Sequence, residues 1–370
     1  MKASNRMLKS YAAVWACATA CIAVSFSLTG CSRSGESAAA QADGRQVARI
    51  ATEWYKSHFK NISLSLTTAV GNDILITGEK VYQHEVPRSY RFEVSISPSN
   101  ETIMVCGICP IDVGGERLGT LREFAVRADY KIRESIATLY LDAKGALRCR
   151  ATMPFDALLV DPDEAMWLMV GSVEAKLSSC EKAARPVCDG GVSLSAAISE
   201  INENAAALNN CPCYRKWVDI YKGRPRTEDV VKRWFDEEAG YYEMHHAGSD
   251  TKFSGVWRFE DGDAMGYGVE IGHQVLTSWC RNPIKFLYEN RRDNEMCEFI
   301  SRFNERSNDV SIIMDFDKGE MFFRHSMPVS VLRLPRTKER LRKTLTDITG
   351  AVYDAYWRTW KDVGSIIGAR

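Results

Sequence analysis

The sequence contains an internal repeat, and a repeat of domain length limits the folds that the chain can adopt. The stretch from Lys144 to Pro154 aligns without a gap with the stretch from Lys318 to Pro328, with five identical residues at an offset of 174. Cys106 and Cys280 share this offset. Weaker matches follow in the same order: Trp54-Tyr55 with Trp234-Phe235, and Glu123-Phe124 with Glu298-Phe299. A common order and a nearly constant spacing indicate a duplicated domain. We therefore predict homologous domains at residues 45–190 and 227–370, joined by a helical linker at residues 191–226.

Hydrophobic periodicity predicts the same order of elements in both copies. The first copy is predicted to have a helix at 46–59, strands at 62–66, 73–82, 90–96 and 102–108, a helix at 118–130, strands at 136–141 and 146–153, and a final helix that begins at Asp161. The second is predicted to have a helix at 230–238, strands at 241–247, 252–259, 265–271 and 275–280, a helix at 294–308, a hairpin across 317–319, and a helix at 338–363. Strands joined by short turns favour an antiparallel sheet packed against helices, so the predicted fold class is α+β in two tandem copies.

One part of this pattern resembles a known family. The helix that carries Glu298, Phe299 and Asn304, followed by the strand from Ile312 to Met314, is similar to the type III secretion chaperone-like sensory fold, and within it to the YbjN-like proteins. The first copy departs from the pattern because Asp129 stands near the place of Asn304. The resemblance implies a non-catalytic module that binds polypeptide or stabilises a partner. Members of the family are often dimeric, so two tandem copies could form a pseudo-dimer.

The N-terminal segment has the features of a secretion signal. Lys2, Arg6 and Lys9 precede an uncharged, mostly apolar run at residues 11–28. The sequence Leu28-Thr29-Gly30-Cys31 resembles the lipobox of bacterial lipoproteins. This resemblance implies a signal peptide at residues 1–30, a lipidated Cys31 in contact with a lipid bilayer and, because Ser32 follows, an outer-membrane location. Residues 31–44, rich in Ser, Ala, Gly and Gln, are predicted to form a flexible tether. An uncleaved anchor or a soluble secreted protein is the alternative.

Charge and motifs exclude several classes of function. Lys plus Arg and Asp plus Glu both number 48, so no overall positive field favours nucleic acid. We find no nucleophile elbow and no phosphate loop, and we predict no cofactor, no metal and no catalytic residue. His245 and His246 are predicted to point to opposite faces of a strand, where they cannot share one metal ion. The run from Asp315 to Gly319 begins like a calcium loop, but its place at a hairpin favours a turn.

The cysteines raise the question of redox chemistry. Cys106 and Cys109 have the spacing of a thioredoxin-type motif, but they are predicted to lie in a strand rather than at the start of a helix. We therefore interpret Cys106 as a small buried residue. Cys180 and Cys188 are predicted to flank a helix end and a loop that contains Pro186, and they are the expected short disulfide.

The last helix suggests a surface for a protein partner. Trp357 and Trp360 are three residues apart, so they lie on neighbouring parts of one helix face. The leading hypothesis is a lipid-anchored envelope protein that binds another polypeptide without catalysis. The alternatives are an envelope enzyme, such as a thiol oxidoreductase or a hydrolase, and a structural lipoprotein that tethers envelope layers.

Overall fold

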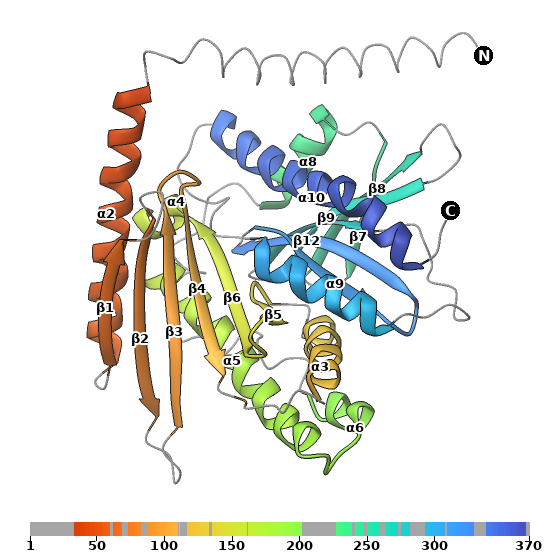
Figure 1. Ribbon diagram of the computed structural model, residues 1–370. Helices are drawn as coiled ribbons and strands as arrows, with labels where there is room; N and C mark the ends of the chain where they lie inside the picture. Colours follow the sequence, from red (N-terminus) through yellow and green to blue (C-terminus); the bar gives the residue numbers. More distant parts are fainter. Residues whose placement is uncertain are drawn as a thin grey trace, which may run out of the picture.

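The fold consists of two six-stranded antiparallel sheets, each with its own helices (Figure 1). The computed structural model describes residues 33–59, 62–68, 73–82, 88–109, 111, 117–132, 135–160, 162–201, 227–238, 241–247, 250–258, 264–272, 275–281, 293–307, 309–328 and 338–367. The first copy comprises α2 (Arg33–His58), β1 (Ile62–Thr68), β2 (Ile74–Tyr82), β3 (Arg88–Ser97), β4 (Thr102–Cys109), α3 (Leu118–Lys131), β5 (Thr138–Leu141), β6 (Leu147–Pro154), α4 (Phe155–Val160) and α5 (Pro162–Cys188). Helix α6 (Leu194–Ser199) follows. The second copy comprises α8 (Thr227–Glu238), β7 (Glu243–Ala247), β8 (Asp250–Arg258), β9 (Ala264–Ile271), β10 (Val275–Arg281), α9 (Asp293–Arg306), β11 (Ser311–Asp315), β12 (Glu320–Pro328) and α10 (Lys338–Ile367).

The two sheets have the same strand order. The first sheet runs β1-β2-β3-β4-β6-β5, and the second, written in the same direction, runs β7-β8-β9-β10-β12-β11. The predicted α+β class with tandem antiparallel sheets is therefore confirmed. Met153 and Met327, which the sequence alignment matched, also occupy equivalent positions in the two sheets. Met153 lies opposite Ile103 of β4, and Met327 lies opposite Leu276 of β10, the strand that corresponds to β4.

The predicted match between Cys106 and Cys280 is wrong by one residue. Cys106 lies opposite Arg150, whereas Arg324, the counterpart of Arg150, lies opposite Trp279 and not opposite Cys280. Successive side chains in a strand point to opposite faces of the sheet. The two thiols therefore lie on opposite faces. Strand β6 corresponds to β12 at an offset of 174, but β4 corresponds to β10 at an offset of 173. The segment between β4 and β6 is therefore one residue shorter than the segment between β10 and β12.

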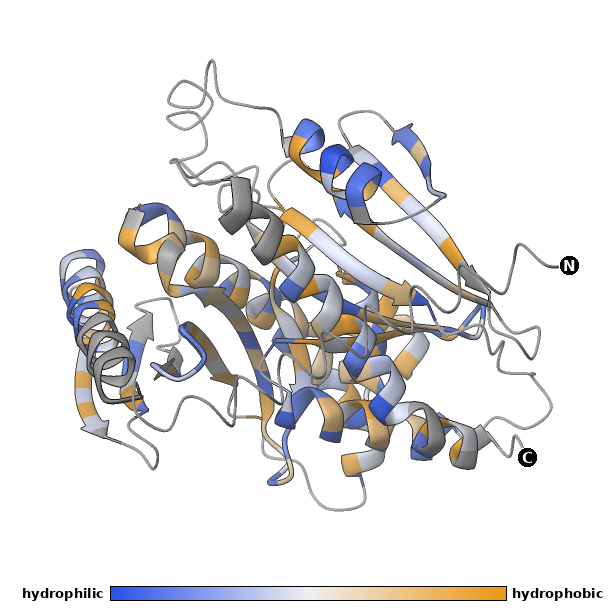
Figure 2. Cartoon of the chain, turned by 90° about the horizontal axis from the view of Figure 1, so that it is seen from above, coloured by the Kyte–Doolittle hydropathy of each residue, from blue (hydrophilic) through white to orange (hydrophobic). Residues whose placement is uncertain are grey.

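One face of each sheet is covered by helices. Alternate residues of β3, among them Phe92, Val94 and Ile96, are buried in the same core as the apolar residues of α2 and α5. In the second copy, Cys280 and Phe323 share a core with Val352 and Tyr356 of α10. Hydrophobic and hydrophilic residues accordingly alternate along the strands and around the helices (Figure 2). This alternation is the physical basis of the two-layer arrangement.

The two copies pack against each other through equivalent elements. Helix α3 contacts α9 and β11, and α9 in turn contacts β5. Across the junction, the Tyr130 hydroxyl donates a hydrogen bond to Asp315 Oδ2 at 2.6 Å, and the Ala143 N–H donates one to Glu305 Oε1 at 3.1 Å. Tyr130 and Glu305 occupy corresponding positions on α3 and α9. Each of them reaches the hairpin of the other copy, as expected for a pseudo-two-fold arrangement.

A buried polar cluster lies beside this junction. Asp129 Oδ1 accepts a hydrogen bond from the Leu139 N–H at 2.7 Å and lies 2.5 Å from Lys176 Nζ. Its other oxygen, Oδ2, is 3.4 Å from Nη2 of Arg324 in the second copy. Asn304 takes the place of Asp129 in the second copy, where it accepts from the Ile312 N–H and donates to the Ile312 carbonyl. Asp129, which stands where the second copy has Asn304, thus lies beside two buried cations, Lys176 and Arg324.

One predicted segment differs from the structure, and a second is described only in part. The tether expected at residues 31–44 is helical from Arg33, as the first turns of α2. Its run of Ala38 to Gln41 has high helix propensity, which explains why helix replaces a flexible chain. In the predicted linker, α6 ends at Ser199, and residues 202–226 lie outside the described residues. No helix among the described residues is both long and apolar enough to cross a membrane.

Candidate functional site

The outer edge of the first sheet is formed by β1. Within the described part of the chain, β1 pairs with β2 on one side and with no strand on the other. Its sequence, ISLSLTT, contains no charged residue and no proline. Ile62 and Leu64 pack against the core, whereas Leu66, on the same face, is 62% exposed. Natural edge strands commonly carry charges or proline that block pairing with another chain, and β1 has neither.

The outer edge of the second sheet, β7, is chemically different. It is shorter, and it carries Glu243, His245 and His246, all exposed. His245 Nε2 lies 3.2 Å from Glu243 Oε2, and His246 Nδ1 lies 3.1 Å from the Thr251 hydroxyl. The two histidines are neighbours on a strand, so they point to opposite faces as predicted. The described residues contain no group of His, Cys, Asp and Glu side chains that could hold a metal ion.

The predicted aromatic surface of the last helix is present in part. Trp357 is 40% exposed, and its ring lies 5.9 Å from Tyr353 and 5.4 Å from Tyr356. Trp360 lies on the same helix, α10, but its side chain is outside the described part of the structure. Cys31, the predicted lipidation site, and the signal peptide at residues 1–30 lie outside the described residues as well.

The thiols of Cys106 and Cys109 have a geometry that does not suit redox exchange. Both residues lie in β4, on opposite faces, and residues three apart in a strand are separated by about 10 Å. Both are buried and free. Burial raises the pKa of Cys106, and it raises the pKa of Cys109 to about 12. Since the thiolate is the reactive form, both groups are poor nucleophiles at neutral pH.

The expected disulfide between Cys180 and Cys188 is not formed. Both thiols are free, and α5 continues through Pro186 to Cys188 instead of ending in a loop. A rise of 1.5 Å per residue places two helical residues eight positions apart about 12 Å from each other along the axis. This distance exceeds the reach of a disulfide. Cys149, Cys280 and Cys297 are buried and free, as predicted.

The run that begins like a calcium loop is a hairpin turn, as the sequence analysis predicts. Asp315 Oδ1 accepts hydrogen bonds from the backbone N–H groups of Asp317 and Lys318 at 3.1 and 3.0 Å. Gly319 has a φ of 64°, which favours glycine, and Gly145 has a φ of 83° in the equivalent turn of the first copy. The Asp315 carboxylate therefore stabilises the turn.

The β1 edge was not identified as a candidate site from the sequence. Strand order decides which strand is at an edge, and periodicity does not reveal strand order. One signal was available, because a strand of alternating serine and apolar residues without any charge is unusual at an exposed edge.

Comparisons with known proteins identify no family. No family model matches the chain, and no curated protein matches it. Among solved structures, the di-domain ARO/CYC StfQ from the steffimycin biosynthetic pathway aligns with 10% identity and a TM-score of 0.15, over 86% of this chain and 92% of that chain. The di-domain ARO/CYC BexL from the BE-7585A biosynthetic pathway aligns with 10% identity and a TM-score of 0.14, over 87% of this chain and 94% of that chain. TM-scores this low do not indicate a shared fold, and we draw no conclusion about activity from them.

Proposed function

We propose that this protein is a non-catalytic, lipid-anchored component of the bacterial cell envelope that binds an extended polypeptide by adding it as a strand beside β1. The uncharged, unpaired edge of β1, with Leu66 exposed, carries the proposal. Strand addition at a free sheet edge is a common mode of peptide recognition. The resemblance of the sequence to chaperone-like proteins supports the same class of function, and the lipobox supports attachment through Cys31 to the outer membrane.

The geometry of β1 specifies the chemistry of the bound segment. Main-chain hydrogen bonds would provide affinity, each with a net value of about 0.5–1.5 kcal/mol. Side chains at alternate positions of the peptide would extend the face of Ile62, Leu64 and Leu66, so these positions should be apolar. The other face of β1 carries Ser63 and Ser65, both exposed, so the intervening peptide positions should be polar.

The proposal is tested with two variants on matched edges. Leu66→Lys places a charge on the β1 edge and should weaken capture of alternating apolar-polar peptides by about tenfold or more, because strand addition would then bury an ammonium group. Met244→Lys places the same charge on the β7 edge, where Met244 is 39% exposed, and should leave capture unchanged. Peptide binding measured by fluorescence anisotropy distinguishes the two variants.

A second measurement tests strand pairing itself. N-methylation at alternate positions of a bound peptide removes every N–H that points to β1, whereas methylation of the other positions removes N–H groups that point to solvent. Methylation of the positions whose N–H groups point to β1 should abolish binding, whereas methylation of the positions whose N–H groups point to solvent should have little effect. Equal effects of the two sets, or loss of binding in Met244→Lys with retention in Leu66→Lys, would contradict the proposal.

A thiol oxidoreductase is the alternative with the clearest sequence motif, but the structure offers it little support. Cys106 and Cys109 cannot bridge within β4, and their raised pKa values disfavour the thiolate. The polypeptide-binding proposal requires no such chemistry, and it uses a strand edge that pairs with no other strand among the described residues.

A further inference from the structure

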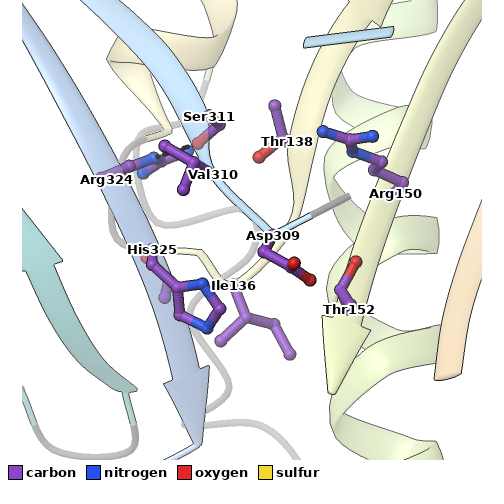
Figure 3. A pocket seen from close by; sticks show the side chains of 10 residues that line it. Ile136, Thr138, Arg150, Thr152, Asp309, Val310, Ser311, Arg324 and His325 are labelled. Carbon is purple, nitrogen blue, oxygen red and sulfur yellow. Dashed lines mark hydrogen bonds between the residues drawn. The ribbon is translucent and has the colours of Figure 1, made fainter. Parts of the chain in front are cut away.

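The two sheets have four edge strands, and two of them meet at the junction of the copies. These inner edges are β5, which contacts α9, and β11, which contacts α3. A small cavity between the copies is lined by residues of both, and Figure 3 shows Arg150 of the first copy and Arg324 of the second on opposite sides of it. The outer edges are β1 and β7, and neither pairs with a further strand among the described residues. Strand β1 lies on the side of the molecule away from the second copy (Figure 1).

The sequence of β1 is self-complementary when two molecules pair this strand antiparallel around Leu64. Ile62 of one molecule then lies opposite Leu66 of the other, Leu64 lies opposite Leu64, and Ser63 lies opposite Ser65. Side chains that are directly opposite in an antiparallel pair point to the same face and contact each other. Apolar residues therefore meet apolar residues, serines meet serines, and Leu66, which is 62% exposed, gains an apolar neighbour.

Other registers fit less well. A shift by one residue places the apolar face of one molecule beside the serine face of the other. Pairing around Ser65 keeps the faces together, but it places Ile62 opposite Thr68 and leaves only the two contacts between Leu64 and Leu66. The pattern of side chains thus selects the register around Leu64.

This register also preserves the layer of helices. The two-fold axis is perpendicular to the sheet, so the faces that carry Ile62 and Leu64 lie on the same side in both molecules. Helix α2 contacts β1, β2 and β3, and the core that contains its apolar residues also packs against Ile62 and Leu64. The helices of both molecules would therefore cover one face of the joined sheet. A short extended peptide brings no helix of its own.

Pairing of β1 with β1 closes the assembly at two molecules. Pairing of β1 with β7 would leave one free β1 and one free β7 at the ends, and the chain of molecules would continue to grow. Strand β7 also carries Glu243 and two exposed histidines, and charged side chains commonly prevent pairing at an edge. The contact between two β1 strands has no charge on either side.

We propose that two molecules of this protein pair through β1 around Leu64, and that this two-fold dimer closes the edge until a bound polypeptide displaces the second molecule. The displacement rests on the proposed function, whereas the dimer does not. A contact made by one pair of short strands is smaller than a standard protein interface, so the dimer dissociates readily and the edge can exchange its occupant.

Disulfide trapping on the purified full-length protein in detergent tests the dimer and its register. Ser63→Cys and Ser65→Cys change exposed side chains and should leave the fold intact. Directly opposite residues have Cα atoms about 4.5 or 5.5 Å apart, within the span of a disulfide, whereas diagonal neighbours are about 7–8 Å apart and exceed it. With oxidised glutathione as the oxidant, a mixture of the two variants should form a linked dimer, and neither variant alone should exceed the wild type. Mass spectrometry of the linked peptides separates this bridge from bridges between native cysteines.

Matched changes on the two outer edges serve as controls. Leu66→Lys, added to both cysteine variants, should reduce the linked fraction by about tenfold or more, because pairing would bury an ammonium group. Met244→Lys on β7 should not reduce it. An excess of an alternating apolar-polar peptide should lower the linked fraction in proportion to the peptide bound.

Each outcome decides one part of the proposal. No link in the mixture, or a link formed by Ser65→Cys alone, would overturn the dimer around Leu64. A linked fraction that does not fall while the peptide binds would overturn the displacement. A mixed link without any peptide binding would support the dimer and contradict the proposed function, whereas peptide binding without the link would do the reverse.

Discussion

Replacement of Asp129 by Asn tests the buried polar cluster beside the junction. Asp129 is 1% exposed, and it faces Lys176 at 2.5 Å and Arg324 at 3.4 Å. In Asp129→Asn the amide oxygen can still accept from the Leu139 N–H, but the amide N–H₂ group then faces the guanidinium, donor against donor. Removing one partner of a buried ion pair costs about 3–5 kcal/mol, because the remaining charge is buried and uncompensated. We expect the free energy of unfolding to fall by this amount.

The assay is urea unfolding followed by tryptophan fluorescence, with two comparisons. Asp354→Asn removes the carboxylate of an exposed pair on α10, with side chains 80% and 53% exposed, and should cost no more than about 0.5 kcal/mol. Asp129→Asn combined with Lys176→Met should cost less than the sum of the single changes, because both break the same contact. A loss below about 1 kcal/mol in Asp129→Asn, or additive effects in the double variant, would refute the reasoning.

Three further predictions concern the anchor, the glycines and the thiols. Cys31→Ala should abolish incorporation of labelled fatty acid, and equal labelling of variant and wild type would contradict the lipobox assignment. Gly78→Ala should destabilise the protein by about 1–3 kcal/mol, since a Cβ there would lie 2.3 Å from the Phe92 ring, whereas Gly350→Ala in α10, with nothing within 4 Å, should stabilise it by about 0.5–1 kcal/mol; thermal unfolding measures both. Burial raises the pKa of Cys280 to about 12. Its folded form therefore keeps a proton that the unfolded chain releases above about pH 8.5, and this thiol alone should lower stability as pH rises from there toward 12, by on the order of 1.4 kcal/mol per pH unit, to which the other buried thiols add. Urea midpoints measured between pH 7 and 10 that show no such decline would contradict this.

The element order was predictable because it depends on local patterns. Alternation from Tyr90 to Ile96 predicted β3, and the shared residues at Lys144 and Lys318 predicted two equivalent hairpins. The end of α5 was not predictable in the same way. Pro186 indicated a loop, but a proline in the last turns of a helix loses only one hydrogen bond, and the packing of Ala183, Ala184 and Val187 in the core holds the helix together. Tertiary burial here outweighs the local signal, and the expected bridge to Cys188 is lost with the loop.

The residues that meet at the junction of the two copies can be identified only from the strand pairing. A sequence alignment with one constant offset cannot supply this pairing. Alignment placed Cys106 over Cys280, but pairing places Arg150 opposite Cys106 and Arg324 opposite Trp279. A shift of one residue moves a side chain to the other face of a sheet. The same pairing places Arg150 and Arg324 at equivalent positions, where both line the small cavity between the copies. Both arginines lie within the aligned stretches, but the sequence assigned neither of them a role. A duplicated sequence thus identifies which strands correspond, whereas the hydrogen-bond register decides which side chains meet at the axis between the copies.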